Sequence, residues 1–252
     1  MHRFYLPENT VTPNLIYTLP EEESRHCVKV LRLRSGDTVS VFDGRGSEFR
    51  AQIDHAAQAI ASVRILEKIA PPAEEISTRI ILALPLTDQH KLEFICEKGA
   101  EMGVHRFSLF HSTRSLTHKP TETLSSNNKA RLHKKCVAAA KQCGRALVPE
   151  ICDPESLTAL FTGYGEAHDT LRILPWEKCT HPHLSSLLHD NPPRTYGAVA
   201  LVTGPEGGFS EDEVAHAKSA GFLSCSLGTR ILRLESAALA SLSLILGALG
   251  QM

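Results

Sequence analysis

Short runs of alternating or β-branched residues fill the first 70 positions of the chain. They include RFYL, CVKVLRL, TVSVF, EFRAQI and ASVRIL, with glycine or proline between several of them. Such runs predict strands with one buried face, and DGRG at Asp43–Gly46 is typical of a hairpin turn because glycine accepts a positive φ. The only helical signal is a possible turn at PEEESRH. We predict a small β-barrel over residues 1–70, followed by a proline-containing linker at 71–77.

The pattern changes after the linker, because strand-like runs now alternate with runs of helical period. RIILAL, VHRFSLF, TLRIL and AVALV are short apolar strands, and NKARLHKKCVAAAKQCG is a helix that ends near Gly144. HKLEFICEKGAEMG repeats its apolar positions every three or four residues and ends at Gly103. Strand and helix in alternation predict an α/β domain with a mainly parallel sheet over residues 78–252.

A glycine-rich turn follows the strand AVALV and precedes a helix. The strand ends at Thr203, the turn is Gly204–Gly208, and Ser210 with Glu213 has the spacing of a capping box. Open α/β sheets bind ligands at such turns. Neither phosphate-binding fingerprint is present, and Pro205 removes a backbone donor that a phosphate would use. The turn therefore suits a cationic or neutral ligand such as S-adenosylmethionine, although its spacing is equally typical of a structural turn.

Three charges interrupt the apolar run from Ser226 to Gly250. They are Arg230, Arg233 and Glu235. We interpret this stretch as the junction between a buried strand and the last helix, where a carboxylate faces the positive end of the helix dipole.

The charge of the chain is balanced overall but unevenly distributed. The formal net charge of the 252 residues is −1, yet the segment from His111 to Pro149 holds eight basic residues and one acid, Glu122. The basic residues of that segment are Arg114, Lys119, Lys129, Arg131, Lys134, Lys135, Lys141 and Arg145. A second basic cluster comprises Arg25, Lys29, Arg32 and Arg34. These clusters indicate either phosphate contacts or ordinary solvated helix faces. Sparse aromatic residues favour a structured RNA over single-strand stacking.

Cysteines and histidines give weaker signals. Seven cysteines without a C-x-x-C pair are typical of reduced thiols in a cytosolic protein. The stretch CTHPH brings Cys179, His181 and His183 together, but no fourth ligand follows in pattern, so we expect no metal site. No run of eighteen apolar residues and no signal segment are visible. We therefore expect a cytoplasmic protein that does not cross a membrane.

Two C-terminal motifs carry a family resemblance. GPEGGFS at Gly204–Ser210 and LGTRILRLESA at Leu227–Ala237 resemble the paired signature of the RsmE family. These SPOUT-class enzymes methylate N3 of a uridine in 16S ribosomal RNA. Further motifs resemble the family in the expected order, at His26–Asp37, Glu97–Val104, Ser112–Ser115 and Lys141–Pro149. The resemblance covers nearly the whole chain.

The resemblance implies a PUA-like β-barrel that helps to hold RNA and an α/β domain with a deep trefoil knot. Gly204–Gly208 and Leu227–Arg233 would thread past each other in the knot, an exception to the usual absence of threaded loops. It also implies a homodimer whose subunits complete each other's sites, and 16S RNA in an assembled small subunit as the substrate. The implied S-adenosylmethionine contacts are Leu174, Gly204, Glu206, Gly207, Leu227, Gly228, Ile231, Leu232 and Arg233.

Methylation of uridine N3 requires that its proton leaves. Either a base removes the proton or a cation stabilises the anionic uracil. We predict that Arg233 or Arg230 stabilises the anion. Glu206 or Glu235 is either the base or a partner in an ion pair. The predicted RNA contacts are Arg25, Lys29, Arg32, Arg34, Arg114, Lys134 and Arg145, and Arg114 and Arg145 are further candidates for the stabilising cation.

The chain departs from the family pattern at three places. Leu86 stands where the family usually has a lysine after ALP, ESA at 235–237 replaces ETA, and a glutamate is missing from CVAAAKQCGR. Two other functions stay open on the sequence. One is a catalytically silent RNA-binding protein on the same scaffold, and the other is an α/β enzyme that uses a nucleotide or NAD.

Overall fold

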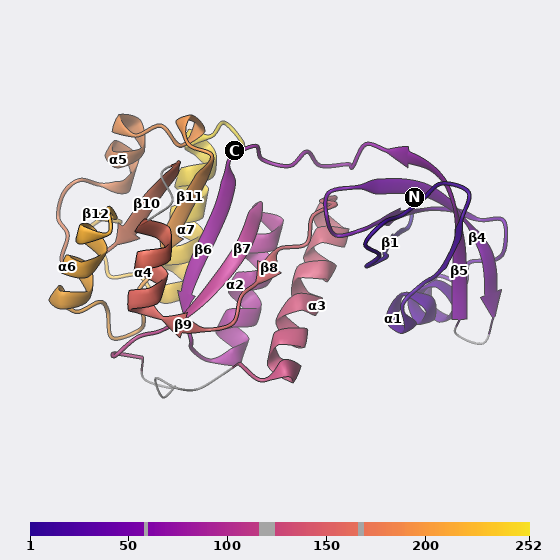
Figure 1. The fold of residues 1–252 in the computed structure, drawn as a ribbon, viewed down its shortest axis with the longest axis horizontal. Helices are drawn as coiled ribbons and strands as arrows, with labels where there is room; N and C mark the ends of the chain where they lie inside the picture. The colour runs from indigo at the N-terminus through magenta and orange to yellow at the C-terminus, as the bar shows by residue number, and fades with distance from the viewer. Residues whose placement is uncertain (58–59, 116–123, 166–168) are drawn as a thin grey trace. The chain divides into compact units, whose positions relative to one another are not determined.

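The chain folds as two units. The structure, a computed structural model, describes residues 1–57, 60–115, 124–165 and 169–252. Unit 1 consists of Met1–Glu75 and Val137–Val148, and unit 2 consists of Ile76–Cys136 and Pro149–Met252. Figure 1 shows the ribbon of both units.

Unit 1 is built on a five-stranded mixed sheet. β1 runs parallel to β3, and the other neighbouring strands are antiparallel. Alternate side chains such as Val39, Val41, Val63 and Ile65 are fully buried and form the core together with Phe4. The unit predicted as a small β-barrel is therefore present as this five-stranded mixed sheet with its own core. In sheet order its strands are β1 (Arg3–Tyr5), β3 (Thr38–Phe42), β4 (Glu48–Ala57), β5 (Ile60–Ile69) and β2 (Ile16–Thr18).

The run CVKVLRL contains no strand, because Cys27–Val30 is helical and Leu31–Leu33 lies in the loop that follows, so its prediction as a strand was wrong. α1 (Glu21–Arg25) leads directly into the π-helix η1 (His26–Val30), and Leu31 N donates to His26 O at 2.9 Å. The three glutamates at the start of α1 face the positive end of the helix dipole. Cys27 is fully buried in the core of unit 1. The alternation of apolar and basic residues imitates a strand, but the helix start at PEEESRH decides the local structure.

The unit boundaries also differ from the predicted domains, because Val137–Val148 belongs to unit 1 and not to one continuous C-terminal domain. Backbone hydrogen bonds hold this segment: Val148 N donates to Gly44 O at 2.9 Å, and Gly46 N donates to Ala146 O at 3.1 Å. α3 (Ser126–Cys143) begins in unit 2 and ends in unit 1. Its helical period continues without a break, so the sequence carries no sign of the change.

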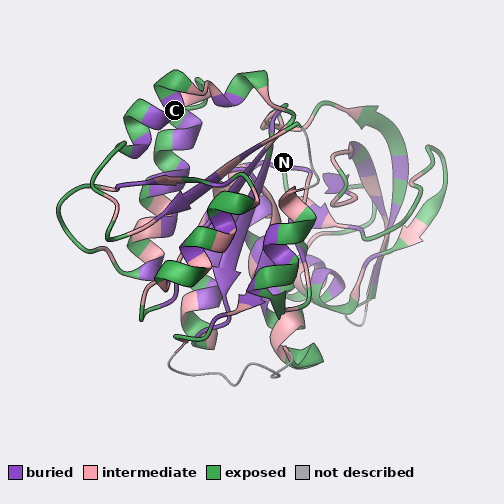
Figure 2. Ribbon diagram, turned by 60° about the vertical axis from the view of Figure 1, so that its left-hand side comes forward, coloured by how far each residue is buried: buried purple, intermediate pink, exposed green. Residues whose placement is uncertain are grey.

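Unit 2 contains a parallel sheet, as predicted. All its paired strands run in the same direction. Figure 2 shows its central strands buried along most of their length, which explains their near-continuous apolar sequences. The strand order is β12 (Leu223–Cys225), β10 (Thr170–Pro175), β11 (Ala198–Val202), β6 (Arg79–Pro85), β7 (Val104–His111) and β8 (Glu150–Ile151), and the short β9 (Glu155–Ser156) also pairs with β7.

Helices cover this sheet. α2 (Gln89–Glu101) packs on β7 and on α7 (Leu234–Ala248), which also contacts α5 (Leu184–Asp190) and the 3-10 helix η2 (Pro193–Thr195). α4 (Leu157–Gly165) packs on β7 and on α6 (Glu211–Ser219). Figure 1 shows α4 in front of the strands and α7 behind them. This arrangement leaves the carboxyl ends of β6, β10, β11 and β12 free to carry the loops of a site.

Two local predictions in this region are confirmed. Ser210 Oγ accepts from Glu213 N at 3.1 Å, and Glu213 Oε2 accepts from Ser210 N at 2.8 Å, which makes the capping box of α6. Glu235 lies in the first turn of α7. The stretch before α7 is a loop from Ser226 to Arg233, because β12 already ends at Cys225.

Candidate active site

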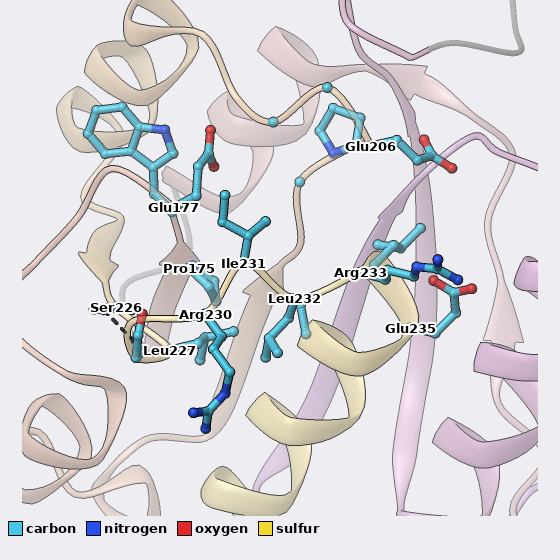
Figure 3. A pocket seen from close by; sticks show the side chains of 18 of the residues that line it. Pro175, Glu177, Glu206, Ser226, Leu227, Arg230, Ile231, Leu232, Arg233 and Glu235 are labelled. Carbon is cyan, nitrogen blue, oxygen red and sulfur yellow. Dashed lines mark hydrogen bonds between the residues drawn. The ribbon is translucent and has the colours of Figure 1, made fainter.

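A pocket of about 600 Å³ lies where the loops after β10, β11 and β12 meet. Its walls are residues 175–177, the turn Gly204–Gly208, the loop 226–233 and the start of α7, with Lys91 of α2. Figure 3 shows the side chains around it. Small-molecule sites typically occupy about 300–1,000 Å³. All the lining residues belong to unit 2, so one unit alone presents these walls.

Close packing on both sides explains the two adjacent glycines of the turn. A Cβ on Gly207 would lie 2.8 Å from the backbone oxygen of Arg114. Gly208 has a φ of +67°, and a Cβ there would collide with the carboxylate of Glu177. Glycine is therefore required at these positions to bring the turn against its neighbours. The same packing places the exposed Arg114 beside the pocket.

The loop 226–233 forms the opposite wall. Ser226 Oγ accepts from Gly228 N at 3.2 Å and stabilises the turn there. Ile231 is 85% exposed although it lines the pocket. Such exposure of a large aliphatic side chain is typical of a binding surface. Leu227 and Leu232 line the same wall, which gives this side of the pocket an apolar surface.

Charged side chains gather at another side of the pocket. Figure 3 shows Glu206, Arg233 and Glu235 on the same side of it. Glu206 Oε1 accepts hydrogen bonds from Lys91 Nζ at 2.9 Å and from the Thr87 hydroxyl at 2.5 Å. Burial acts to raise the pKa of Glu206, but these two hydrogen bonds outweigh it and lower the pKa below its ordinary value. The hydrogen bond to Glu206 raises the pKa of Lys91, so both partners are charged at neutral pH.

Two buried polar atoms in the pocket wall have no hydrogen-bond partner among the residues that the structure describes. They are Trp176 Nε1, a donor, and Glu235 Oε2, an acceptor. Buried polar groups are normally paired, so this donor and acceptor indicate that a polar ligand completes the wall.

The structure brings nearly all of the predicted cofactor residues together. Every one of them lines the pocket except Leu174, which is fully buried in β10. The three proposed catalytic residues, Arg233, Arg230 and Glu206, also line it. Their chemical roles stay predictions. Sequence reasoning missed further lining residues, although most of them follow directly after strands or continue a predicted motif: Lys91, Pro175, Trp176, Glu177, Ser226 and Thr229.

The basic segment 111–149 is largely neutralised by acids from other parts of the chain. In unit 2, three of its cations form ion pairs of 2.8 to 3.0 Å. Lys119 and Glu122 lie outside the described residues. The local excess of positive charge is therefore much smaller in the folded unit than along the sequence. The three pairs are Lys129–Asp153, Arg131–Glu93 and Lys135–Glu97.

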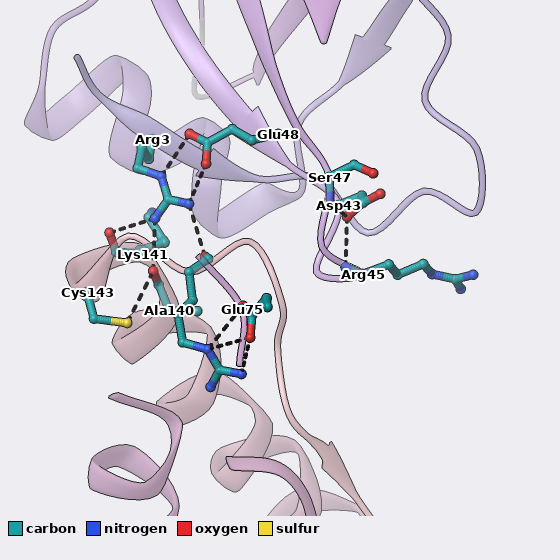
Figure 4. Close-up of polar contacts among 10 residues, drawn as sticks. Arg3, Asp43, Arg45, Ser47, Glu48, Glu75, Ala140, Lys141 and Cys143 are labelled. Carbon is teal, nitrogen blue, oxygen red and sulfur yellow. Dashed lines mark hydrogen bonds and ion pairs between the residues drawn. The ribbon is translucent and has the colours of Figure 1, made fainter. Parts of the chain in front are cut away.

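Unit 1 holds the last two cations of this segment in a network that Figure 4 shows around Arg3, Glu48 and Glu75. Lys141 pairs with Glu23 at 2.8 Å. Arg145 is buried, with 4% of its surface exposed, and its Nη2 lies 2.7 Å from Glu75 Oε2. This placement corrects the prediction that Arg145 contacts RNA, because its guanidinium is enclosed and already holds a carboxylate. The same placement removes it from the candidates for catalysis.

The other predicted RNA contacts lie on the surface. Arg25, Lys29, Arg32 and Arg34 are exposed in and after α1 and η1 of unit 1, and Arg25 pairs with Glu21 at 3.1 Å. Lys134 is an exposed residue of α3. Their binding to RNA stays a prediction.

The structure gives no support for a metal site at the stretch CTHPH. His181 and His183 have ring centroids 5.3 Å apart. Within the described ranges, no three His, Cys, Asp or Glu residues are grouped so that they could hold a metal ion. Among the helices of the same ranges, none is long and apolar enough to cross a membrane.

Comparison with known proteins decides the family. The RNA methyltransferase domain matches residues 74–246, and the RNA methyltransferase PUA domain matches residues 19–61. The chain is 31% identical to ribosomal RNA small subunit methyltransferase E of Synechocystis sp. over 228 residues, which cover 90% of this chain and 72% of that protein. The chain belongs to the ribosomal RNA small subunit methyltransferase E family.

Two further members of the methyltransferase E family extend the likeness to both ends of the chain. The Bacillus subtilis protein is 27% identical, and the alignment covers 97% of this chain and 96% of that one. The crystal structure of the Neisseria gonorrhoeae protein bound to S-adenosylmethionine has a TM-score of 0.85 and 27% identity, covering 98% of this chain and 97% of that chain. The α/β fold with a PUA unit, inferred from sequence motifs, is therefore the fold of the methyltransferase E family.

Proposed function

We propose that the chain transfers a methyl group from S-adenosylmethionine to N3 of a uridine in 16S ribosomal RNA. The observation that carries this proposal is the pocket formed by Gly204–Gly208 and the loop 226–233 in a methyltransferase E family member. A catalytically silent RNA-binding protein would have no need of such a pocket. The absence of both phosphate fingerprints from the turn argues against a nucleotide or NAD enzyme.

The chemistry of the pocket suits S-adenosylmethionine. Pro205 offers no backbone N–H to a phosphate, whereas Glu206 and Glu235 offer negative charge to a sulfonium or an ammonium group. The exposed Ile231 and the neighbouring Leu232 offer apolar contact to an adenine ring. The unpaired Trp176 Nε1 and Glu235 Oε2 can each pair with a polar atom of the ligand. When bound, the cofactor supplies an electrophilic methyl group.

The residues of the chain must then place the uracil and stabilise its anion. Arg230 and Arg233 are exposed cations in the pocket wall, and either can lower the energy of the negative charge that develops when N3 loses its proton. Glu206 is a poor base because its pKa is lowered by Thr87 and Lys91. We therefore assign the cationic role to Arg233, with Arg230 as the second candidate, and treat Glu206 as an ionised carboxylate.

The RNA would be held by phosphate contacts on both units. Arg25, Lys29, Arg32 and Arg34 would serve in unit 1 and Arg114 and Lys134 in unit 2. Arg114 is the residue best placed to hold RNA near the reacting base, since its backbone packs against Gly207. We propose the assembled small subunit as the substrate, which places the reaction in the cytoplasm.

A homodimer is part of the same proposal. Phe94 of α2 and Leu244 of α7 are 45% and 42% exposed, and the two helices pack on each other in unit 2. Large apolar side chains on neighbouring helices favour an interface. Light scattering after size-exclusion chromatography should give twice the mass of the 27.6-kDa chain, and the double variant Phe94→Ser, Leu244→Ser should shift it towards the monomer.

The experiment for the cofactor uses the protein's own fluorescence, because its single tryptophan, Trp176, lines the pocket. Titration with S-adenosylmethionine should change this fluorescence, whereas ATP and NAD should not. Calorimetry provides the same binding constant without the fluorophore. A chain that binds ATP or NAD and ignores S-adenosylmethionine would contradict the proposal.

The experiment for the reaction uses small subunits that lack the modification and cofactor labelled on its methyl group. Wild-type protein should yield labelled N3-methyluridine, identified by mass spectrometry of digested RNA. Arg233→Ala should lower the turnover at least tenfold, which corresponds to a loss of about 1.4 kcal/mol in transition-state stabilisation. Its affinity for the cofactor should stay within about threefold of the wild type, because the cation acts on the uracil anion. An Arg233→Ala protein with wild-type turnover would remove Arg233 from catalysis. Cofactor binding without any transfer would favour the silent RNA-binding protein.

A further inference from the structure

The carboxylate of Glu213 serves two parts of unit 2 at once. One oxygen, Oε2, accepts from Ser210 N at 2.8 Å and completes the capping box of α6. The other oxygen, Oε1, accepts from the hydroxyls of Ser112 and Thr113 at 3.3 and 3.1 Å. These two hydroxyls belong to the segment Ser112–Ser115, which follows β7. The capping glutamate therefore also holds a distant segment, although the cap itself needs no such bond.

Further hydrogen bonds fix the backbone of this segment around Arg114. Arg114 N donates to Ser112 Oγ at 3.3 Å, and the same hydroxyl donates to Glu213, so the carboxylate reaches the backbone of Arg114 through one side chain. Ser115 Oγ donates to the backbone of the loop after β6 at 2.8 Å. Arg114 also packs on the glycine turn of the pocket, where a Cβ on Gly207 would lie 3.0 Å from Arg114 Cβ. The position of Arg114 beside the pocket is therefore well defined.

Arg114 is the cation of the basic segment 111–149 whose charge is still available. Among the residues that the structure describes, its guanidinium has no hydrogen bond and no ion pair. The other described lysines and arginines of that segment all have partners. Glu211, whose pKa is lowered by Lys178 and to a smaller extent by Arg114, is already held by Lys178 at 2.8 Å. An exposed guanidinium without a partner suits the phosphate groups of RNA.

We propose that Glu213 is a positioning residue for RNA binding. With Ser112 and Thr113 it holds Arg114 where the guanidinium receives a phosphate of the RNA near the reacting uridine. This inference rests on the proposed methyl transfer and adds to it one carboxylate and two hydroxyls. Arg114 is the group that touches the RNA, and the other three residues act through it by hydrogen bonds within unit 2.

A segment that is ordered before the RNA arrives strengthens binding without any new contact. An arginine on a loose segment loses backbone freedom when a phosphate fixes it, and this ordering opposes binding. The hydrogen bonds of Glu213 are already present in the free protein, so folding meets that cost instead. Because the acceptor is a carboxylate, these bonds are stronger than bonds to a neutral acceptor. Removing them should therefore weaken RNA binding even though neither hydroxyl touches the RNA.

Three variants separate the two tasks of Glu213. The double variant Ser112→Ala, Thr113→Val removes the two hydroxyls and leaves the capping box intact; we call it the hydroxyl variant. Ser210→Ala removes the hydroxyl of the capping box and leaves the bonds to Glu213 Oε1, which makes it the matched control. Arg114→Ala removes the proposed phosphate contact itself.

Limited proteolysis tests the positioning in the protein without RNA. Trypsin cleaves after arginine, and only where the backbone opens locally. Mass spectrometry should find the Arg114–Ser115 bond cleaved about fivefold faster in the hydroxyl variant than in the wild type, as expected for the loss of about one net hydrogen bond. Ser210→Ala should be cleaved there at the wild-type rate. Unchanged cleavage in the hydroxyl variant would overturn the inference, because the segment would then be held without Glu213.

Co-sedimentation with small subunits that lack the modification tests the contact to RNA. We expect Arg114→Ala to lower the slope of log affinity against log salt by about 0.7–0.9, as the loss of one phosphate contact does. The hydroxyl variant should bind about threefold more weakly than the wild type, because its arginine must be ordered on binding. Ser210→Ala should bind as the wild type does. Wild-type affinity and salt slope in Arg114→Ala would overturn the inference.

A double-mutant cycle decides whether Glu213 acts through Arg114. In the Arg114→Ala background the two hydroxyl changes should weaken subunit binding no further, because the side chain that they position is gone. A merely structural effect would weaken binding by the same factor in both backgrounds. Such additivity would overturn the inference.

The proteolysis experiment keeps this inference separable from the proposed function. A wild-type protein that neither binds nor methylates small subunits would overturn the proposed function, and with it the phosphate contact, whatever proteolysis shows. A hydroxyl variant whose segment is cleaved faster, but which binds and methylates small subunits as the wild type does, would confirm methyl transfer and overturn the positioning role of Glu213.

Discussion

Arg145 gives a sharp test because the sequence and the structure assign it different roles. The sequence places it in a basic segment and predicts a phosphate contact. The structure encloses it: its side chain is 5% exposed and that of its partner Glu75 is 22% exposed. Arg145 Nη2 and Nε reach Glu75 Oε2 at 2.7 and 3.2 Å, and Nε also reaches Oε1 at 3.2 Å. The substitution Arg145→Met keeps much of the side-chain length and removes these bonds and the charge.

The expected cost follows from this burial. Removing one partner of a buried ion pair costs about 3–5 kcal/mol, because the other charge is left without compensation. Glu75 keeps some contact with water, so we expect a loss of about 2–3 kcal/mol in the free energy of unfolding. The double variant Arg145→Met, Glu75→Gln should recover at least half of the loss, because no unpaired charge remains. Lys129→Met is the control, since its exposed pair with Asp153 should contribute only about 0–1 kcal/mol.

Urea unfolding followed by circular dichroism measures these differences in the free energy of unfolding. Filter binding of a 16S RNA fragment measures whether Arg145 contacts RNA. Under conditions where the variant is folded, Arg145→Met should bind the RNA as the wild type does. A variant of unchanged stability with several-fold weaker RNA binding would refute the assignment of Arg145 to the interior of unit 1.

Four shorter predictions test other parts of the structure. Ser210→Ala removes the capping box of α6 and should cost about 1 kcal/mol in urea unfolding; no loss would mean that the cap is dispensable. Gly208→Ala strains a backbone with φ +67° and should weaken S-adenosylmethionine binding at least tenfold in the Trp176 fluorescence titration, whereas unchanged affinity would separate the turn from the cofactor. Burial raises the pKa of the Cys225 thiol to about 12, so mass spectrometry after iodoacetamide treatment at pH 8 should find Cys225 unmodified until urea unfolds the chain; since the thiolate is the reactive form, early modification would contradict its burial. Arg32→Ala should reduce the slope of log affinity for RNA against log salt by about 0.7–0.9, and an unchanged slope would exclude a phosphate contact.

Features that depend on neighbouring residues were predictable from the sequence. The capping box needs only Ser210 and Glu213, and the glycine turn is recognisable because three glycines and a proline follow a buried strand within five residues. The alternation of apolar strands with helical periods also gave the parallel sheet. That the segments 204–208 and 226–233 share a site was expected from the family resemblance, and the parallel sheet agrees with it because loops at the carboxyl ends of parallel strands meet at one edge.

Features that depend on distant residues were not predictable. Lys91 and Glu206 are 115 residues apart, and nothing in the periodicity of α2 distinguishes Lys91 from its other polar positions. The charge count of segment 111–149 failed for the same reason, because its cations pair with acids that lie elsewhere in the chain. The helix α3 is continuous in sequence pattern but divided between the units, and only long-range hydrogen bonds such as that between Val148 and Gly44 show where its end belongs.

The most direct test of the whole account is a map of methylated uridines in 16S ribosomal RNA. Mass spectrometry would compare RNA from a strain without this gene, the same strain with the wild-type gene restored, and the strain with the Arg233→Ala gene. We predict that one N3-methyluridine disappears in the deletion strain, returns with the wild-type gene and returns much less with Arg233→Ala. An N3-methyluridine signal that is unchanged in the deletion strain would contradict the account.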